Sequence, residues 1–189
     1  MRTSHASRPL AIAAVTAGVV LFAASPSLAG ADSVRSDGEI HRYGSTADFP
    51  EDATARVRAV YDAAGDTVVT LHVRGLNPNR TYGAHAHVNA CGLTGAAAGP
   101  HDQHSPDPAA TPSVPSSDPA YANPVNEIWL DVTTNAAGNG VALAKQPWQF
   151  APGKAPRSVI IHAERTATGA QDGAAGAAGA RLACVDVSF

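Results

Sequence analysis

The sequence predicts an all-β fold built from antiparallel strands. Three observations favour this class. Apolar and polar residues alternate over several short segments, turn-forming residues separate these segments, and no segment has the periodicity of an amphipathic helix. Short alternating strands that recur along a chain are typical of a small sandwich or barrel. We therefore expect one β domain over 51–189, preceded by an N-terminal segment over 32–50 and an export signal over 1–31.

The first 31 residues have the composition of a secretory signal peptide. Arg2 and Arg8 give a basic start, 10–24 carries no charge, and small residues follow. The uncharged stretch is short for a membrane span. We expect cleavage near Ala29 to Ala31, a secreted or cell-envelope location and no stable membrane insertion afterwards. The alternative is a retained N-terminal anchor.

The strongest strand signals come next in the chain. Apolar and polar residues alternate over 55–61 and again over 67–76, with an Ala-Ala-Gly turn between them. This pattern predicts a two-faced antiparallel hairpin. A possible first strand covers 39–43, and an extended segment over 81–88 follows the turn residues at 77–79.

Residues 92–126 differ from the flanking segments, because Gly and Ala come first and six prolines follow between 106 and 124. This proline density excludes a helix or a central strand, and so long a loop within a compact domain is usually functional or disordered. After the loop, we expect strands at 127–134, 141–144 (after an Asn-Gly turn at 139–140), 158–164 and 182–188. A second long loop, rich in Gly and Ala, covers 168–180.

The charge and the two cysteines limit the possible partners and compartments. The net charge of −3 gives no electrostatic reason to expect nucleic-acid binding. In an exported chain, two cysteines indicate an oxidising compartment and a Cys91–Cys184 disulfide. The alternative is two buried free thiols.

Four histidines lie where a metal site could form. His85 and His87 are two residues apart in a predicted strand, so both side chains leave the same face. His162 lies in another predicted strand, and His101 lies at a loop end after Gly99-Pro100. Taken alone, His162 is more often a packed or exposed histidine. Imidazole ligands suit copper and zinc, and a redox role would favour copper.

Five separated motifs resemble, in order and spacing, those of the copper/zinc superoxide dismutases. They are Gly83-Ala84-His85-Ala86-His87, Cys91, Ala98-Gly99-Pro100-His101, the strand that ends at His162, and Ala178-Gly179-Ala180-Arg181-Leu182-Ala183-Cys184. The likeness extends from about residue 57 to 187. It implies a Greek-key β-barrel or sandwich with two long functional loops and one intrachain disulfide.

The resemblance also implies roles for individual residues. His85, His87 and His162 correspond to copper ligands, and His101 corresponds to the ligand that bridges copper to zinc in the family. Cys91 and Cys184 correspond to the intrachain disulfide, and Arg181 lines the channel to the copper. A guanidinium beside a metal attracts and hydrogen-bonds a small anion such as superoxide.

The chain departs from the family in the zinc region, where His104 is the only further histidine in the loop. His104 could join His101, Asp102 or Asp107 around zinc, but a solvated loop histidine is the preferred interpretation. The pattern is more similar to copper-only members, in which a carboxylate holds the bridging histidine. Glu127 is the first candidate for this task and Asp131 the second.

The resemblance therefore implies a copper-dependent enzyme, without zinc, that dismutates superoxide to oxygen and hydrogen peroxide outside the cytoplasm. His101 would exchange a proton with the product, and Arg181 would guide the substrate. The alternative is a copper-binding protein of the cell envelope without turnover. The sequence predicts no particular oligomeric state.

Overall fold

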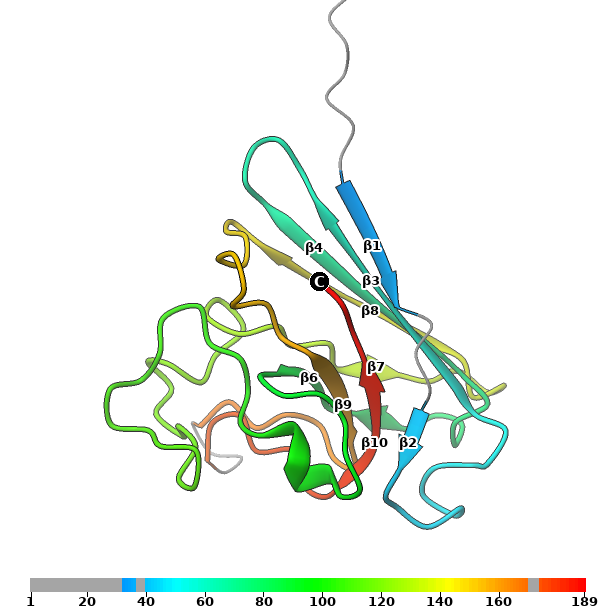
Figure 1. Ribbon diagram of the computed structural model, residues 1–189. Helices are drawn as coiled ribbons and strands as arrows, with labels where there is room; N and C mark the ends of the chain where they lie inside the picture. The colour runs from blue at the N-terminus through cyan, green and yellow to red at the C-terminus, as the bar shows by residue number, and fades with distance from the viewer. Residues whose placement is uncertain (1–31, 37–39, 170–173) are drawn as a thin grey trace, which may run out of the picture.

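The structure is a computed structural model that describes residues 32–36, 40–169 and 174–189. Two four-stranded antiparallel sheets face each other, and long loops cover the far side of one of them (Figure 1). The first sheet has the order β1-β3-β4-β8, and the second has the order β2-β10-β9-β6. A two-stranded sheet, β5-β7, and one 3-10 turn complete the described part of the chain.

The strands of the first sheet are β1 (Asp32–Ser36), β3 (Thr54–Tyr61), β4 (Thr67–Arg74) and β8 (Gly140–Gln146). Those of the second sheet are β2 (Ile40–Arg42), β6 (Ala84–His87), β9 (Ser158–His162) and β10 (Arg181–Asp186). The short elements are β5 (Thr81–Tyr82), β7 (Val132–Thr133) and the 3-10 turn η1 (Gly95–Ala98).

The first sheet is buried on one face only. In β3 and β4, residues alternate between buried and less buried positions, and Val57 lies opposite Leu71 in the antiparallel register. Both side chains are fully buried in the core between the sheets, whereas Arg58 points outward and is exposed. This arrangement confirms the two-faced hairpin that the alternation predicts.

The second sheet is buried on both faces. All five residues of β9 are buried, because Val159 and Ile161 face the first sheet and Ile160 faces the other way. Ile160 packs with Ala98 of η1 and with Cys184, so the loop after β6 covers the outer face of this sheet. A two-sided environment of this kind holds polar residues away from water.

The predicted fold class is confirmed as an antiparallel sandwich of Greek-key type, with two long loops and the predicted Cys91–Cys184 disulfide. The strand pairs β4-β8 and β2-β10 join elements that lie far apart in the sequence.

Three details of the strand prediction are wrong. The strand β1 was not expected, and it forms because it adds to the edge of the first sheet beside β3. The expected strand at 127–134 shortens to β7, preceded by isolated bridges at Glu127 and Trp129. The turn before β8 ends at Gly138, one residue before the predicted Asn-Gly pair. Gly138 has φ 73°, and a Cβ there would lie 2.0 Å from the Leu76 carbonyl oxygen, so only glycine fits this turn.

The expected signal peptide at 1–31 lies outside the described residues. Within the described ranges, none of the helices is both long enough and apolar enough to cross a bilayer.

Candidate metal centre

Four histidine side chains converge on the outer side of the second sheet. His85 and His87 come from β6, His162 ends β9, and His101 lies in the loop that follows η1. One ring nitrogen of each lies within 4.8 Å of the corresponding nitrogens of the other three. Three of the rings are buried, and His101 is partly buried. The sequence pattern thus predicted a group of residues that the fold does bring together.

Backbone contacts between neighbouring segments bring these histidines together. The His162 N–H donates to the Gly83 carbonyl oxygen (2.7 Å), and the Gly83 N–H donates to the Glu164 carbonyl oxygen (2.7 Å). A Cβ at Gly83 would lie 2.7 Å from that Glu164 oxygen, so the close approach requires glycine. An isolated bridge between His87 and His101 fixes the loop histidine beside β6.

Hydrogen bonds to oxygen acceptors fix the tautomers of two of the buried histidines. Nδ1 of His87 lies 3.0 Å from the Gly99 carbonyl oxygen, and Nδ1 of His162 lies 3.3 Å from that of Gly179. A carbonyl oxygen can only accept, so each Nδ1 carries the proton. The other ring nitrogen, Nε2, therefore has a lone pair available for a metal.

Glu127 holds the loop histidine. Nδ1 of His101 donates to Oε2 of Glu127 at 2.8 Å, and the carboxylate is almost fully buried. Trp129 Nε1 donates to the same oxygen, and Gln103 Nε2 donates to Oε1, each at 2.7 Å. Three donors thus surround a buried carboxylate and fix its orientation, and Nε2 of His101 is left to face the other histidines.

A second carboxylate reaches His85 through a threonine. Nε2 of His85 lies 2.7 Å from Oγ1 of Thr166, and this hydroxyl forms a short hydrogen bond with Asp131. Asp131 also accepts from the Thr166 N–H at 2.9 Å. Because the hydroxyl donates to the carboxylate, it accepts from Nε2–H of His85, which leaves Nδ1 as the metal-facing nitrogen. Asp131 therefore orients His85 in this structure and not His101.

The donor set fits a metal ion. Nδ1 of His85 and Nε2 of His87 and of His162 are buried and lack a hydrogen-bond partner among the described residues. Buried polar atoms without partners are rare and need an explanation, which a shared cation would provide. Burial lowers the pKa values of His85 and His87 well below the usual range and that of His162 to about 3, so these ligands are neutral at physiological pH. Four imidazoles suit copper or zinc.

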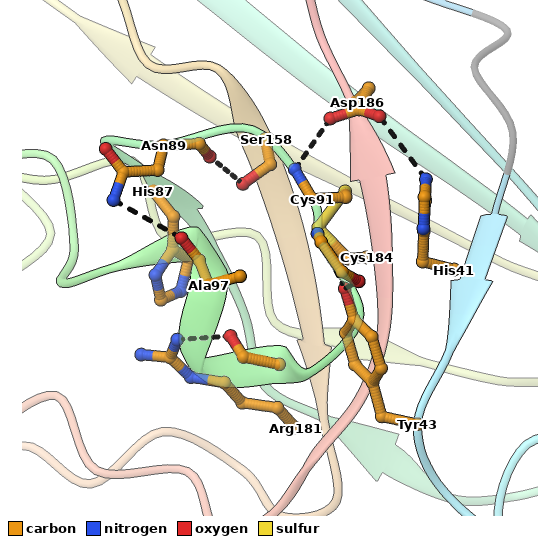
Figure 2. The surroundings of a disulfide bond; sticks show 12 residues. His41, Tyr43, His87, Asn89, Cys91, Ala97, Ser158, Arg181, Cys184 and Asp186 are labelled. Atoms are coloured by element: carbon orange, nitrogen blue, oxygen red, sulfur yellow. Dashed lines mark hydrogen bonds and ion pairs between the residues drawn. A yellow bond between two sulfur atoms is a disulfide. The ribbon is translucent and has the colours of Figure 1, made fainter.

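Arg181 lies beside this cluster, at the start of β10. Its Nη1 donates to the Gly95 carbonyl oxygen (2.7 Å) and its Nη2 to that of Gly99 (2.8 Å). Gly99 also accepts from His87, so one peptide group holds both the arginine and a metal-facing histidine. Figure 2 shows the Arg181 side chain extending from β10 to the loop that carries Cys91.

The disulfide anchors that loop to the second sheet. Cys91 is bonded to Cys184 of β10, and the Cys91 N–H donates to Asp186 at 2.7 Å (Figure 2). The Tyr43 hydroxyl donates to the Gly92 carbonyl oxygen at 3.0 Å. These contacts hold the start of the loop, and the loop in turn provides the acceptors for Arg181.

The cluster opens into a cleft of about 1010 Å³. His101, His162 and Arg181 line the cleft, together with parts of the proline-rich loop and of the loop after β8. A small solute can therefore approach the edge of the cluster, at His101 and His162, and the guanidinium from the same side.

The structure does not place the remaining zinc candidates in the cluster. The His104 ring stacks on Trp148 with a centroid separation of 4.5 Å and is exposed. Asp107 accepts hydrogen bonds from Ser116 and Ala109, and the Ser116 hydroxyl lowers its pKa. Burial raises the pKa of Asp102 to about 6, and Glu127 adds to this shift.

Several contributors to the site were missed by sequence reasoning. Thr166, Trp129 and Gln103 orient the metal-facing residues, but nothing in their local pattern indicated this. Trp129 is two residues from Glu127, and this spacing is a weak signal of a shared face. Thr166 is four residues beyond His162 in a loop, where no periodicity applies.

Comparisons with known proteins show the fold. A scan against protein-family models gave no match, and a search of curated proteins gave none either. Among solved structures, the chain is similar to the Cu/Zn superoxide dismutase from Brucella abortus, with a TM-score of 0.52 and 17% identity over 83% of this chain and 100% of that one. It is also similar to the clock protein EA4, with a TM-score of 0.55 and 17% identity over 82% of this chain and 94% of that one. The chain therefore has a superoxide dismutase-like fold.

Proposed function

We propose that this protein is an exported copper enzyme that dismutates superoxide to oxygen and hydrogen peroxide without zinc. The observation that carries the proposal is the convergence of four histidine nitrogens, three of them buried and without partners, beside a guanidinium in an open cleft. The fold likeness to a Cu/Zn superoxide dismutase supports the assignment to superoxide chemistry, and the proposal of a site without zinc rests on the contact between Glu127 and His101.

His85, His87 and His162 would hold the copper permanently, and His101 would be the fourth ligand. Copper supplies an acceptor and then a donor for one electron, so two superoxide ions and two protons give one oxygen and one hydrogen peroxide. The three buried imidazoles hold their positions through Thr166 and two carbonyl groups. Fixed ligands of this kind limit the rearrangement that accompanies a change of charge.

His101 is the residue that we assign to proton transfer. It is the one histidine of the four that a loop carries, it is only partly buried, and it lines the cleft. Glu127 keeps the proton on Nδ1, so Nε2 is the atom that accepts and returns a proton. This carboxylate takes the place of a second metal at the far nitrogen, which is why we propose a copper-only site.

Arg181 would attract and orient the anion. Its two hydrogen bonds to carbonyl oxygens fix the plane of the guanidinium without neutralising its charge. A fixed positive charge at the cleft floor raises the local concentration of a small anion.

A metal and activity assay on matched variants tests this proposal. Wild type purified and loaded with copper should hold one copper and no zinc per chain and should remove superoxide. His162→Ala should lose both copper and activity, and His104→Ala, a control that removes a histidine outside the cluster, should keep both. Arg181→Ala should keep copper and lose at least about tenfold in rate.

Three outcomes would contradict the proposal. Copper binding without superoxide removal would favour the non-catalytic copper protein. Stoichiometric zinc in the active protein would refute the copper-only site. Full activity in His162→Ala would exclude the histidine cluster as the catalytic centre.

A further inference from the structure

The outward face of the first sheet concentrates positive charge. Arg56, Arg58, His72, Arg74 and Lys145 occupy outward positions of β3, β4 and β8, and all five are exposed. No acidic residue occupies an outward position of these three strands. Because the whole chain has a net charge of −3, this basic face is a marked local asymmetry. Lys145 forms an ion pair with Asp66 at 2.8 Å.

Aliphatic side chains lie between these basic residues. Val141 is 60% exposed and Leu143 is 63% exposed, both on β8. In the sheet register, Leu143 lies opposite Thr70, and Thr70 lies opposite Arg58. Exposed aliphatic side chains and guanidinium groups therefore lie in the same cross-strand rows of the basic face.

A small cavity of about 400 Å³ lies at one end of the basic face. His72 and Arg74 line it from β4, Val141 from β8, and Asn135 and Asn139 from the turn before β8. Cationic and amide side chains around one cavity are suitable donors for a phosphate group.

We propose that the basic face docks on a membrane surface that contains anionic phospholipids, with a headgroup phosphate in the cavity beside Arg74. Guanidinium groups would contact the phosphates, and Leu143 and Val141 would enter the boundary between headgroups and acyl chains. A second copy of this chain is a poor occupant, because a symmetric contact would set arginines against arginines. A polysaccharide would make no use of the exposed aliphatic side chains.

Docking through this face would leave the metal centre accessible. The histidine cluster lies on the outer side of the second sheet, and the basic face lies on the outer side of the first (Figure 1). The cleft would then open away from the lipid. The inference concerns a different surface from the histidine cluster and holds whether or not the protein removes superoxide.

Sedimentation with lipid vesicles tests the inference. The full chain is mixed with vesicles of phosphatidylcholine alone or with about one third phosphatidylglycerol, at low and high salt. Arg58→Glu/Arg74→Glu is compared with Lys154→Glu/Arg157→Glu, which has the same charge change elsewhere. Leu143→Ser is compared with Leu93→Ser, which removes a fully exposed leucine outside the basic face. All proteins carry the same N-terminal residues, so any vesicle binding by residues 10–24 contributes equally to every sample.

The expected result is salt-sensitive binding to anionic vesicles only. Arg58→Glu/Arg74→Glu should weaken this binding by at least about 30-fold, and its charge control should weaken it far less. Leu143→Ser should weaken it about fivefold while Leu93→Ser has no effect. Equal binding to neutral vesicles, equal loss in both charge variants, or no effect of Leu143→Ser would overturn the inference. If Leu143→Ser has no effect and the protein binds tightly to soluble polyphosphate, the partner is an anionic polymer.

Discussion

The two sheets differ in how many faces they bury. The first sheet covers the core with one face and exposes the other, so buried and less buried residues alternate over β4 and most of β3. The second sheet lies between the core and the covering loops, and β6 and β9 are buried at every residue. The histidine cluster is on the second sheet, where the loops exclude water from the metal-facing nitrogens.

The two outer faces of the sandwich therefore have different roles: the outer face of the second sheet carries the histidine cluster, and the outer face of the first sheet does not. Polar groups on the outer face of the first sheet are solvated and replaceable. Polar groups on the outer face of the second are buried and need partners, because an unsatisfied buried group is costly. Substitutions on the two outer faces should therefore differ greatly in their effects.

The largest effect should come from the disulfide that fastens the covering loop to the second sheet. Cys91→Ser/Cys184→Ser removes a link between residues 93 positions apart, which in the chain-entropy model lowers the free energy of unfolding by about 4–5 kcal/mol. Urea unfolding measures this loss, and reduced wild type should match the variant. A loss below about 1 kcal/mol would show that the loop is held without the disulfide.

The next largest effect should come from Glu127→Gln. The amide keeps one acceptor oxygen, so its N–H group would face either Gln103 or the donors of His101 and Trp129, and the fixed orientation of His101 would weaken. We expect copper affinity to fall by about 10–100-fold. Competition with a copper chelator measures the affinity, and Asp102→Asn, the same change at the adjacent carboxyl group, should have a smaller effect. Equal losses in the two variants would contradict a specific role for Glu127.

Thr166→Val should have a smaller effect on the same property. The change keeps the shape of the side chain but removes the hydroxyl between His85 and Asp131. We expect a loss of about tenfold in copper affinity, at the low end of the range for residues that orient a ligand. Thr81→Val, which removes a hydroxyl bonded only to Thr133 at the surface, is the control. Unchanged affinity in Thr166→Val would show that His85 is oriented without the threonine.

The smallest effect should come from the outer face of the first sheet. Arg58→Gln should change the free energy of unfolding by less than about 0.5 kcal/mol, because Arg58 is exposed. Val57→Ala, one residue away on the inward face, should cost about 1–3 kcal/mol by leaving a cavity. Similar losses in the two variants would show that substitutions on the outer face are as costly as substitutions in the core.

The same difference explains which elements the sequence predicts well. In the one-sided first sheet, alternation over 55–61 and 67–76 located β3 and β4 closely. β1 has a polar sequence and forms through pairing with β3, which local patterns do not encode. The segment 127–134 contains apolar residues, but the first of them pack and form hydrogen bonds around Glu127 instead of extending a strand. Only two residues of the segment form a strand.

For the site, the histidines were predictable because their spacing and motifs are local features. His85 and His87 share a face of one strand, and the resemblance suggested His101, His162 and Glu127. The partners that orient them were not predictable in the same way. Thr166, Asp131 and the Gly179 carbonyl group reach the cluster through loops, and their contacts depend on the complete fold.

Electron paramagnetic resonance of the Cu(II)-loaded protein tests the central claim most directly. We predict one Cu(II) per chain with nitrogen couplings from histidine ligands, and a changed spectrum in each single variant His85→Ala, His87→Ala, His101→Ala and His162→Ala. His104→Ala should leave the spectrum unchanged. A wild-type spectrum without histidine nitrogen couplings, or one that His101→Ala and His162→Ala do not alter, would contradict a shared copper site.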